Sequence, residues 1–214
     1  MLETMKTAVF DMDGTLIDSM AEWRRLNVSF LGEYGIIPTP EEEAQLNSMS
    51  GSMAAVYIRD HFGVDTDYVR LVGHSTKRME PVYRRGVPLK PGALSYLRRL
   101  RARGVRCVVA TATPANLALL ALNRLNLVSE LDYIFSTDMV GGGKSDPAFY
   151  DRLLAMIGAQ KEGCVMFEDA LYAMRGARGA GLGVVGITDE TNLRDRGAIR
   201  EVCDVVIDSF AELE

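Results

Sequence analysis

The chain has 214 residues, with 24 Lys and Arg against 29 Asp and Glu, so its formal net charge is −5. Hydrophobic residues make up 48% and charged residues 25% of the chain, which excludes an intrinsically disordered protein. The acidic balance leaves no basic footprint for nucleic acid, and no apolar run reaches the roughly 18 residues of a membrane span. We expect a globular protein without nucleic-acid or membrane partners, as a monomer or a weak homo-oligomer.

The cysteines and the N-terminal residues indicate the compartment. Cys107, Cys164 and Cys203 are odd in number, far apart and set in apolar surroundings, which is typical of reduced core thiols rather than of disulfides or a zinc site. The stretch MLETMKTAVF lacks a charged region followed by a long apolar region, so it does not resemble a signal peptide. We expect a cytoplasmic protein whose translation starts at Met1 or at Met5.

Short apolar runs alternate with helical patterns along most of the chain. Most of these runs are continuously apolar, as strands are when both faces of a parallel sheet are covered. The alternation predicts an α/β fold with a doubly wound, mostly parallel sheet and right-handed crossovers. The expected strands are residues 7–11, 105–110, 133–136, 164–167, 182–187 and 204–207, and the expected helices are residues 92–103, 114–126, 147–157, 171–180 and 195–201.

The stretch between the first strand and Pro88 contains no convincing strand. Apolar residues there recur at helical spacing from Trp23 to Tyr34, and Gly35 follows as a stop signal. The run Thr39-Pro40-Glu41-Glu42 is a capping box, and residues 53–62 and 67–85 also have helical patterns. We therefore expect an all-helical cap domain, residues 17–88, inserted into an α/β core made of residues 1–16 and 89–214.

Polar side chains follow the strands at the edge where an open α/β sheet binds ligands, the carboxyl ends of its strands. Four of the five strand ends carry a carboxylate and the other carries a hydroxyl, which a purely structural sheet would not need. We therefore expect the site among these residues, which are Asp11, Thr111, Thr137 and Asp138, Glu168 and Asp169, and Thr188 and Asp189.

Asp11 and Asp13 follow the first strand directly and precede Gly14. Close carboxylates repel one another unless a cation or a proton lies between them, and Mg²⁺ prefers carboxylate, carbonyl and water oxygens as ligands. Glu168 and Asp169 end another apolar strand and can approach the same cation. The structural alternative is that Asp13 caps a short turn.

Thr111 and Lys144 are candidates for holding an anion. Thr111 ends a strand and opens a helical pattern, where a hydroxyl and backbone N–H groups form a phosphate site, although an ordinary N-cap before a proline has the same pattern. Lys144 follows the glycines 141–143, and a lone lysine in such a loop is usually solvated.

The segment Asp11-Met12-Asp13-Gly14-Thr15-Leu16-Ile17-Asp18-Ser19 resembles motif I of the haloacid dehalogenase superfamily in its phosphatase form. Thr111 is similar to motif II, Lys144 to motif III and Glu168-Asp169 to motif IV, in the same order and spacing. The helical insert resembles the C1-type cap, and the chain looks most similar to the β-phosphoglucomutase-like phosphatases. The resemblance covers essentially the whole chain, and motif I is its most specific part.

The resemblance implies a Mg²⁺-dependent enzyme that forms an aspartyl-phosphate. By motif position, Asp11 is the nucleophile, and Asp13 is the general acid for the leaving alcohol and then the base for the hydrolytic water. The implied metal ligands are Asp11, the backbone carbonyl of Asp13, Asp169 and Glu168, and the implied phosphate ligands are Thr111, the N–H of Ala112 and Lys144.

Two motifs depart from the family pattern. Motif III commonly reads Lys-Pro-x-Pro, whereas this chain has Lys144-Ser145-Asp146-Pro147, which predicts a less rigid loop. Motif IV commonly continues as Ser-x-x-Gly, whereas Ala170 and Ala173 stand here, and Ala173 adds a methyl group where a helix packs closely. Neither departure removes a reacting group.

We expect a phosphatase of a small phosphomonoester, of the sugar or polyol phosphate class. A sugar-phosphate mutase uses the same reacting groups, but the cap loop expected to face the site, residues 48–53, has no Arg or Lys to bind a second phosphate. A phosphate-binding regulatory module without turnover is the third alternative, and the complete set of reacting groups argues against it. His61 and His74 lie in the insert, and either has a proton role only if the cap closes over the site.

Overall fold

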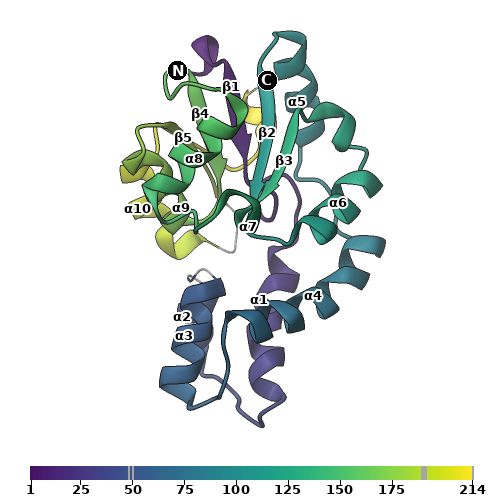
Figure 1. The fold of residues 1–214 in the computed structure, drawn as a ribbon, viewed down its shortest axis with the longest axis vertical. Helices are drawn as coiled ribbons and strands as arrows, with labels where there is room; N and C mark the ends of the chain where they lie inside the picture. The colour runs from purple at the N-terminus through teal and green to yellow at the C-terminus, as the bar shows by residue number, and fades with distance from the viewer. Residues whose placement is uncertain (48, 50, 189–191, 214) are drawn as a thin grey trace.

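The computed structural model describes residues 1–47, 49, 51–188 and 192–213. Its sheet consists of parallel strands in the order β3-β2-β1-β4-β5-β6 (Figure 1). Phe10 of the central strand β1 is level with Val109 of β2 and with Phe167 of β4, so these three strands end side by side. The doubly wound α/β fold class is confirmed. The strands are β1 Thr7–Phe10, β2 Arg106–Thr111, β3 Tyr133–Ser136, β4 Cys164–Glu168, β5 Gly183–Ile187 and β6 Val205–Ile207.

Helices cover both faces of the sheet because its strands are apolar on both sides. Successive residues of β1 alternate between two apolar clusters, since Ala8 and Phe10 belong to the first and Val9 to the second. This alternation between two buried faces explains why the strands are continuously apolar. The first face carries α5 (Ala93–Ala102) and α6 (Ala115–Arg124), and the second carries α8 (Pro147–Ile157), α9 (Leu171–Gly179) and α10 (Arg196–Val202).

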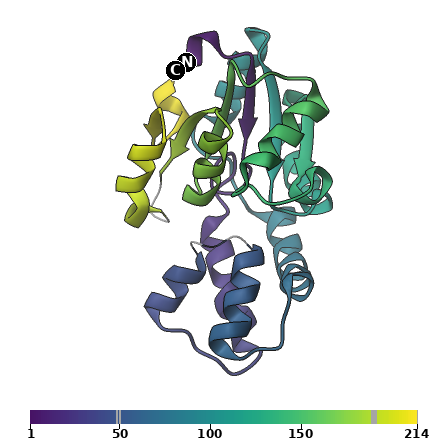
Figure 2. The same ribbon diagram turned by 60° about the vertical axis from the view of Figure 1, so that its left-hand side comes forward.

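Between β1 and α5 the chain forms a helical insert beyond the carboxyl ends of the strands (Figures 1 and 2). The insert encloses an apolar cluster of its own, which includes Phe30, Leu46, Ile58 and Leu71. The all-helical insert predicted from the sequence is therefore present. Its helices are α1 (Met20–Gly32), α2 (Pro40–Asn47), α3 (Gly51–Phe62) and α4 (Tyr68–Arg85).

The two connections between the insert and the sheet run side by side. The Asp18 N–H donates to the Pro88 carbonyl at 2.9 Å, and the Lys90 N–H donates to the Leu16 carbonyl at 2.9 Å. Lys90 Nζ also lies 3.2 Å from a carboxylate oxygen of Asp18. The expected boundaries, after residue 16 and after residue 88, fall within this pair of connections and stay a prediction.

Of the helix ends that the sequence indicated, the capping box is confirmed, whereas the end of α1 differs from the prediction. The capping box is formed, because Glu42 Oε2 accepts from the Thr39 N–H at 2.7 Å and Thr39 Oγ1 accepts from the Glu42 N–H at 3.3 Å. Helix α1 ends at Gly32, before the expected stop at Gly35. The single turn α7 (Thr137–Val140) was not predicted, since four residues are too few to show a period.

The cysteines are free thiols, as expected, and burial raises the pKa of Cys107, Cys164 and Cys203 to about 12 in each case. They therefore stay protonated and unreactive at neutral pH. Within the described part of the chain, no helix combines the length and the apolarity that crossing a bilayer requires.

Candidate active site

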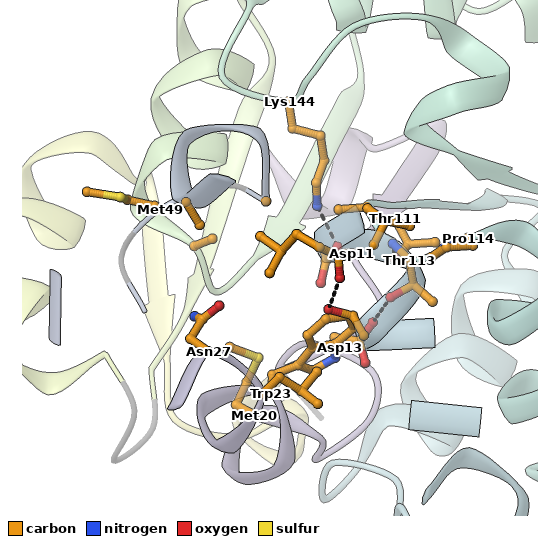
Figure 3. Close-up of a pocket in the computed structure, with 18 of the residues that line it drawn as sticks. Asp11, Asp13, Met20, Trp23, Asn27, Met49, Thr111, Thr113, Pro114 and Lys144 are labelled. Carbon is orange, nitrogen blue, oxygen red and sulfur yellow. Dashed lines mark hydrogen bonds and ion pairs between the residues drawn. The ribbon is translucent and has the colours of Figure 1, made fainter. Parts of the chain in front are cut away.

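A cavity of about 200 Å³ lies between the carboxyl edge of the sheet and the helical insert (Figure 3). The core lines it with residues that end or follow β1, β2 and β4 and with Lys144, which precedes α8. The insert lines it with residues of α1, α2, α3 and α4 and with Met49. The structure thus brings together all of the predicted site residues, which are Asp11, Asp13, Thr111, Ala112, Lys144, Glu168 and Asp169.

The turn after β1 places Asp169 against the backbone of motif I. Gly14 has a φ of +82°, and a Cβ at this residue would lie 2.1 Å from Asp169 Oδ2, so only glycine fits here. Thr15 Oγ1 donates to Asp169 Oδ1 at 3.4 Å. The Asp11 N–H donates to the Phe167 carbonyl at 2.9 Å, which extends the β1–β4 pairing to the first carboxylate. The ends of β1 and β4 therefore hold Asp11 and Asp169 together.

Asp11, Glu168 and Asp169 form a buried cluster in which one carboxylate oxygen from each lies within 4.8 Å of the others. Burial raises the pKa of Asp11 to about 8, against the lowering effect of Lys144. Burial, together with the charges of Glu168 and Asp11, also raises the pKa of Asp169. Buried carboxylate oxygens at this spacing fit Mg²⁺, and a divalent cation would favour the ionised forms of Asp11 and Asp169.

Lys144 is buried, so the solvated-loop alternative does not hold. Its Nζ donates to Asp11 Oδ1 at 2.5 Å and to Glu168 Oε2 at 2.7 Å. Burial by itself lowers the pKa of this ammonium, but the charges of Asp11 and Glu168 raise it well above the usual value. Glu168 Oε1 accepts from the N–H groups of Asp169 and Ala170 at 3.1 and 3.0 Å. This arrangement favours Glu168 as a support for Lys144 over a direct metal ligand.

Helix α9 packs closely on the loop that carries Lys144, although Ala173 replaces the glycine common in the family. Ala173 is fully buried, and a close contact with the loop is made three residues further along, at Gly176. A Cβ at Gly176 would lie 2.0 Å from the Lys144 carbonyl oxygen. The packing of α9 on this loop therefore requires a glycine at position 176.

Thr111 ends β2, and its hydroxyl oxygen accepts from the Thr113 N–H at 3.0 Å. Helix α6 begins only at Ala115, so the expectation that Thr111 opens this helix is wrong. The residues between them form a turn, in which Ala112 is exposed and lines the cavity. Because the Thr111 oxygen is the acceptor in its bond, its proton can be donated to an anion.

Asp13 is half-buried and accepts hydrogen bonds from three hydroxyl groups. Ser19 Oγ donates to its Oδ1 at 2.6 Å, Tyr83 OH donates to the same oxygen at 2.5 Å, and Thr113 Oγ1 donates to Oδ2 at 2.7 Å. Burial and the charge of Asp13 raise the pKa of Tyr83 well above its usual value, so the phenol keeps its proton. A carboxylate that caps a turn accepts from backbone N–H groups, whereas these three partners of Asp13 are side-chain hydroxyls.

Of these three partners, Ser19 belongs to the motif I segment, whereas nothing in the sequence indicated Tyr83 or Thr113. Tyr83 and Thr113 lie 70 and 100 residues from Asp13 along the chain, so no motif spacing links them to it. The nearest signal for Thr113 was its place two residues after Thr111. Trp23, whose indole N–H donates to Tyr83 OH at 3.1 Å, was assigned only to the helical spacing of the insert.

The site was expected among five strand ends, and two of these ends lie outside the cavity lining. Asp138, after β3, is exposed, and Thr188, after β5, hydrogen-bonds to Asp208. The reason is their place in the sheet, since β3 is an edge strand and β5 is two strands from β1. Asp189 lies outside the described residues.

Of the insert residues named as candidates, some line the cavity and others do not. Met49 and Gly51 of the predicted cap loop 48–53 line the cavity, whereas Ser48 and Ser50 lie outside the described residues. The two histidines are engaged within the insert and do not line the cavity. His61 pairs with Glu42 at 2.6 Å, and His74 pairs with Glu33 at 3.2 Å.

The chain is similar to known proteins over most of its length. A family model described as a haloacid dehalogenase-like hydrolase matches residues 5–181. The validoxylamine A 7'-phosphate phosphatase of Streptomyces hygroscopicus subsp. limoneus is 29% identical over 216 residues, which cover 97% of this chain and 95% of that protein. A phosphorylated carbohydrates phosphatase of Thermotoga maritima is 29% identical over 210 residues, which cover 91% and 93%. Hexitol phosphatase B of Escherichia coli strain K12 is 24% identical, with coverage of 96% and 93%.

Solved structures share the fold over the whole chain. A variant of CbbY from Rhodobacter sphaeroides in complex with xylulose-(1,5)bisphosphate matches with a TM-score of 0.83 and 24% identity, and the match covers 98% of this chain and 96% of that one. A hydrolase from Pseudomonas syringae matches with a TM-score of 0.82 and 24% identity, with coverage of 97% and 95%.

Proposed function

This chain belongs to the haloacid dehalogenase-like hydrolases and is a phosphoric monoester hydrolase, and from that premise we propose a Mg²⁺-dependent phosphatase of small sugar or polyol phosphates that works through an aspartyl-phosphate. The observation that carries the proposal is the buried cluster of Asp11, Glu168 and Asp169 with Lys144 bonded to it. A carboxylate that attacks a phosphate dianion needs cationic neighbours, because both reactants are negative. Lys144 is one such cation, and a metal ion bound by the carboxylates would be another.

In the first half-reaction Asp11 is the nucleophile. One of its carboxylate oxygens forms a bond to phosphorus while the bond from phosphorus to the alcohol oxygen breaks, and Asp13 gives its proton to that oxygen. Thr111, the N–H of Ala112 and Lys144 hold the equatorial oxygens, over which the negative charge spreads in the transition state.

In the second half-reaction water attacks phosphorus from the side that the alcohol left. Asp13, now ionised, takes a proton from this water, and inorganic phosphate departs as the Asp11 carboxylate is regenerated. Bound Mg²⁺ supplies Lewis-acid neutralisation of the phosphate charge, and Asp11, the backbone carbonyl of Asp13 and Asp169 are the residues that would hold it.

The insert selects the leaving alcohol, because it forms the side of the cavity opposite the reacting groups. Its contribution combines apolar and aromatic residues such as Trp23 with the amide of Asn27 and the hydroxyls of Ser75 and Thr76. A sugar or polyol offers hydroxyls to the polar groups and C–H groups to the aromatic ring. The names of the phosphatase relatives support the same substrate class.

The mutase alternative requires a second phosphate site, since both phosphates of a bisphosphate must be held. The cap-loop residues that line the cavity, Met49 and Gly51, are uncharged. Among the described lining residues, Arg24 of α1 is the only lysine or arginine from the insert, so a second phosphate would depend on this one side chain. Hydrolysis requires no such site, and we therefore favour the phosphatase.

The test is phosphate release from a broad panel of small phosphomonoesters, with and without Mg²⁺, by the wild type, Asp11→Asn and Asp138→Asn. We expect Mg²⁺-dependent release that Asp11→Asn lowers by at least about a thousandfold and that Asp138→Asn, on the exposed strand end, leaves unchanged. An Asp11→Asn variant that kept about a tenth of wild-type kcat would exclude the nucleophile assignment. Conversion of glucose 1-phosphate to glucose 6-phosphate, without free phosphate, would favour the mutase.

A further inference from the structure

Three hydroxyl groups from distant parts of the chain meet at the carboxylate of Asp13. Ser19 directly precedes α1, Tyr83 lies in the last turn of α4 and Thr113 follows β2. Of these, Tyr83 belongs to the helical insert and to none of the motifs recognised above. Its hydroxyl oxygen lies 2.5 Å from Asp13 Oδ1.

We propose that Tyr83 is a positioning residue that fixes the carboxyl group of Asp13 for proton transfer. This inference rests on the proposed function, because it needs Asp13 to exchange protons with the leaving alcohol and with water. It goes beyond that function because the helical insert, besides selecting the substrate, then supplies part of the acid-base geometry.

Tyr83 is itself held in one place. Its side chain is fully buried, and its backbone carbonyl accepts a hydrogen bond from Arg124 Nε of α6 at 2.7 Å. Arg124 also donates to the carbonyl of Val87, just beyond the end of α4. The last turn of α4 is therefore fastened to the core, and the phenol oxygen has a defined position relative to Asp13.

The direction of the Tyr83 proton is set by Trp23. The indole N–H of Trp23 donates to the phenol oxygen at 3.1 Å, so the single proton of the phenol is directed at the carboxylate. Thr113 Oγ1 lies 3.5 Å from the same phenol oxygen and donates to the other oxygen of Asp13. A carboxyl group held at both oxygens keeps one orientation, and proton transfer depends on that orientation.

Trp23 connects this network to the substrate. It lines the cavity and it also donates to Tyr83, so an alcohol that packs on the indole touches the same chain of groups that orients Asp13. The geometry therefore links binding of the leaving group to the position of the acid.

The test is the leaving-group dependence of Tyr83→Phe. Protonation matters much for an alkoxide leaving group and little for p-nitrophenolate. We expect kcat/KM for the fastest sugar phosphate of the panel to fall about tenfold or more, with kcat/KM for p-nitrophenyl phosphate within about twofold of wild type. Both values come from one preparation, so their ratio does not depend on the folded fraction.

Tyr96→Phe is the matched control, since Tyr96 is a second buried tyrosine whose ring packs on Phe167 and Phe210 outside the cavity lining. It should leave the ratio of the two substrates unchanged. Tyr83→Phe leaves the indole N–H of Trp23 without its acceptor, and the variant could fail to fold for this reason. In that case Trp23→Phe is compared with the Trp23→Phe/Tyr83→Phe double variant. The quantity compared is again the ratio of kcat/KM for the sugar phosphate to kcat/KM for p-nitrophenyl phosphate.

An unchanged ratio, or an equal fall for both substrates, would overturn the role of Tyr83. Asp13→Asn separates this outcome from a failure of the proposed function. A strong leaving-group dependence in Asp13→Asn without one in Tyr83→Phe overturns the positioning role alone. If Asp13→Asn has no such dependence, the acid assignment on which the inference rests is overturned as well.

Discussion

Replacing Gly176 by alanine tests the close contact between α9 and the loop that carries Lys144. A Cβ at residue 176 would lie 2.0 Å from the Lys144 carbonyl oxygen and 3.1 Å from the carbonyl carbon of Ser145. Both are backbone atoms, so rotation of a side chain cannot relieve the clash. Either the helix or the loop must move, and Lys144 Nζ is bonded to Asp11 at 2.5 Å and to Glu168 at 2.7 Å.

The size of the effect follows from the distance. A contact of 2.0 Å must open by about 1 Å to reach the 3.0 Å below which Cβ contacts essentially never occur. Overpacking of this kind destabilises a protein by about 1–3 kcal/mol. A displacement of about 1 Å at a group that positions the reaction lowers the rate by about a hundredfold. We therefore expect Gly176→Ala to lower kcat about a hundredfold and stability by about 2 kcal/mol.

The assay is steady-state turnover of the fastest substrate with Mg²⁺, together with unfolding in urea. Gly73→Ala is the control, because Gly73 is exposed in the middle of α4 and a Cβ there meets nothing within 4 Å. It should stabilise the protein by about 0.5–1 kcal/mol, since alanine is the better helix former, and leave kcat unchanged. Wild-type kcat and stability in Gly176→Ala would refute the argument that this glycine places Lys144.

Three further predictions concern the charges and one helix end. Lys144→Met leaves the buried carboxylates of Asp11 and Glu168 without their counter-charge, so we expect loss of turnover and a destabilisation of about 3 kcal/mol in urea, and an unchanged midpoint would contradict this. A carboxyl whose folded pKa is raised, as at Asp11 to about 8, stabilises the metal-free fold at low pH and loses this contribution as the pH rises through that value. Because Mg²⁺ needs the ionised form, it should raise Tm more at about pH 9 than at about pH 6, and a larger rise at the lower pH would count against the site. Thr39→Ala removes one bond of the capping box, so it should lower stability by about 1 kcal/mol in urea with turnover intact, and a loss of turnover would be unexpected.

Local patterns in the sequence determined most of the architecture. The continuous apolar runs predicted each strand of the sheet to within one residue at either end, because a strand covered on both faces is apolar at every position. Thr39 and Glu42 could be read as a helix start because the capping box joins groups three residues apart. Asp11 and Asp169 could be placed together because parallel strands end at one edge of the sheet.

Tertiary structure alone decided which side chains meet around these carboxylates. Asp138 follows one apolar strand and Glu168 ends another, yet the first is exposed after an edge strand and the second is buried next to β1. Tyr83 reaches Asp13 across 70 residues, and the close approach of α9 to the Lys144 loop lies at Gly176, which belongs to no motif of the sequence. Such contacts depend on where rigid helices lie to within an ångström, which the packing of the whole core sets and no periodicity along the chain records.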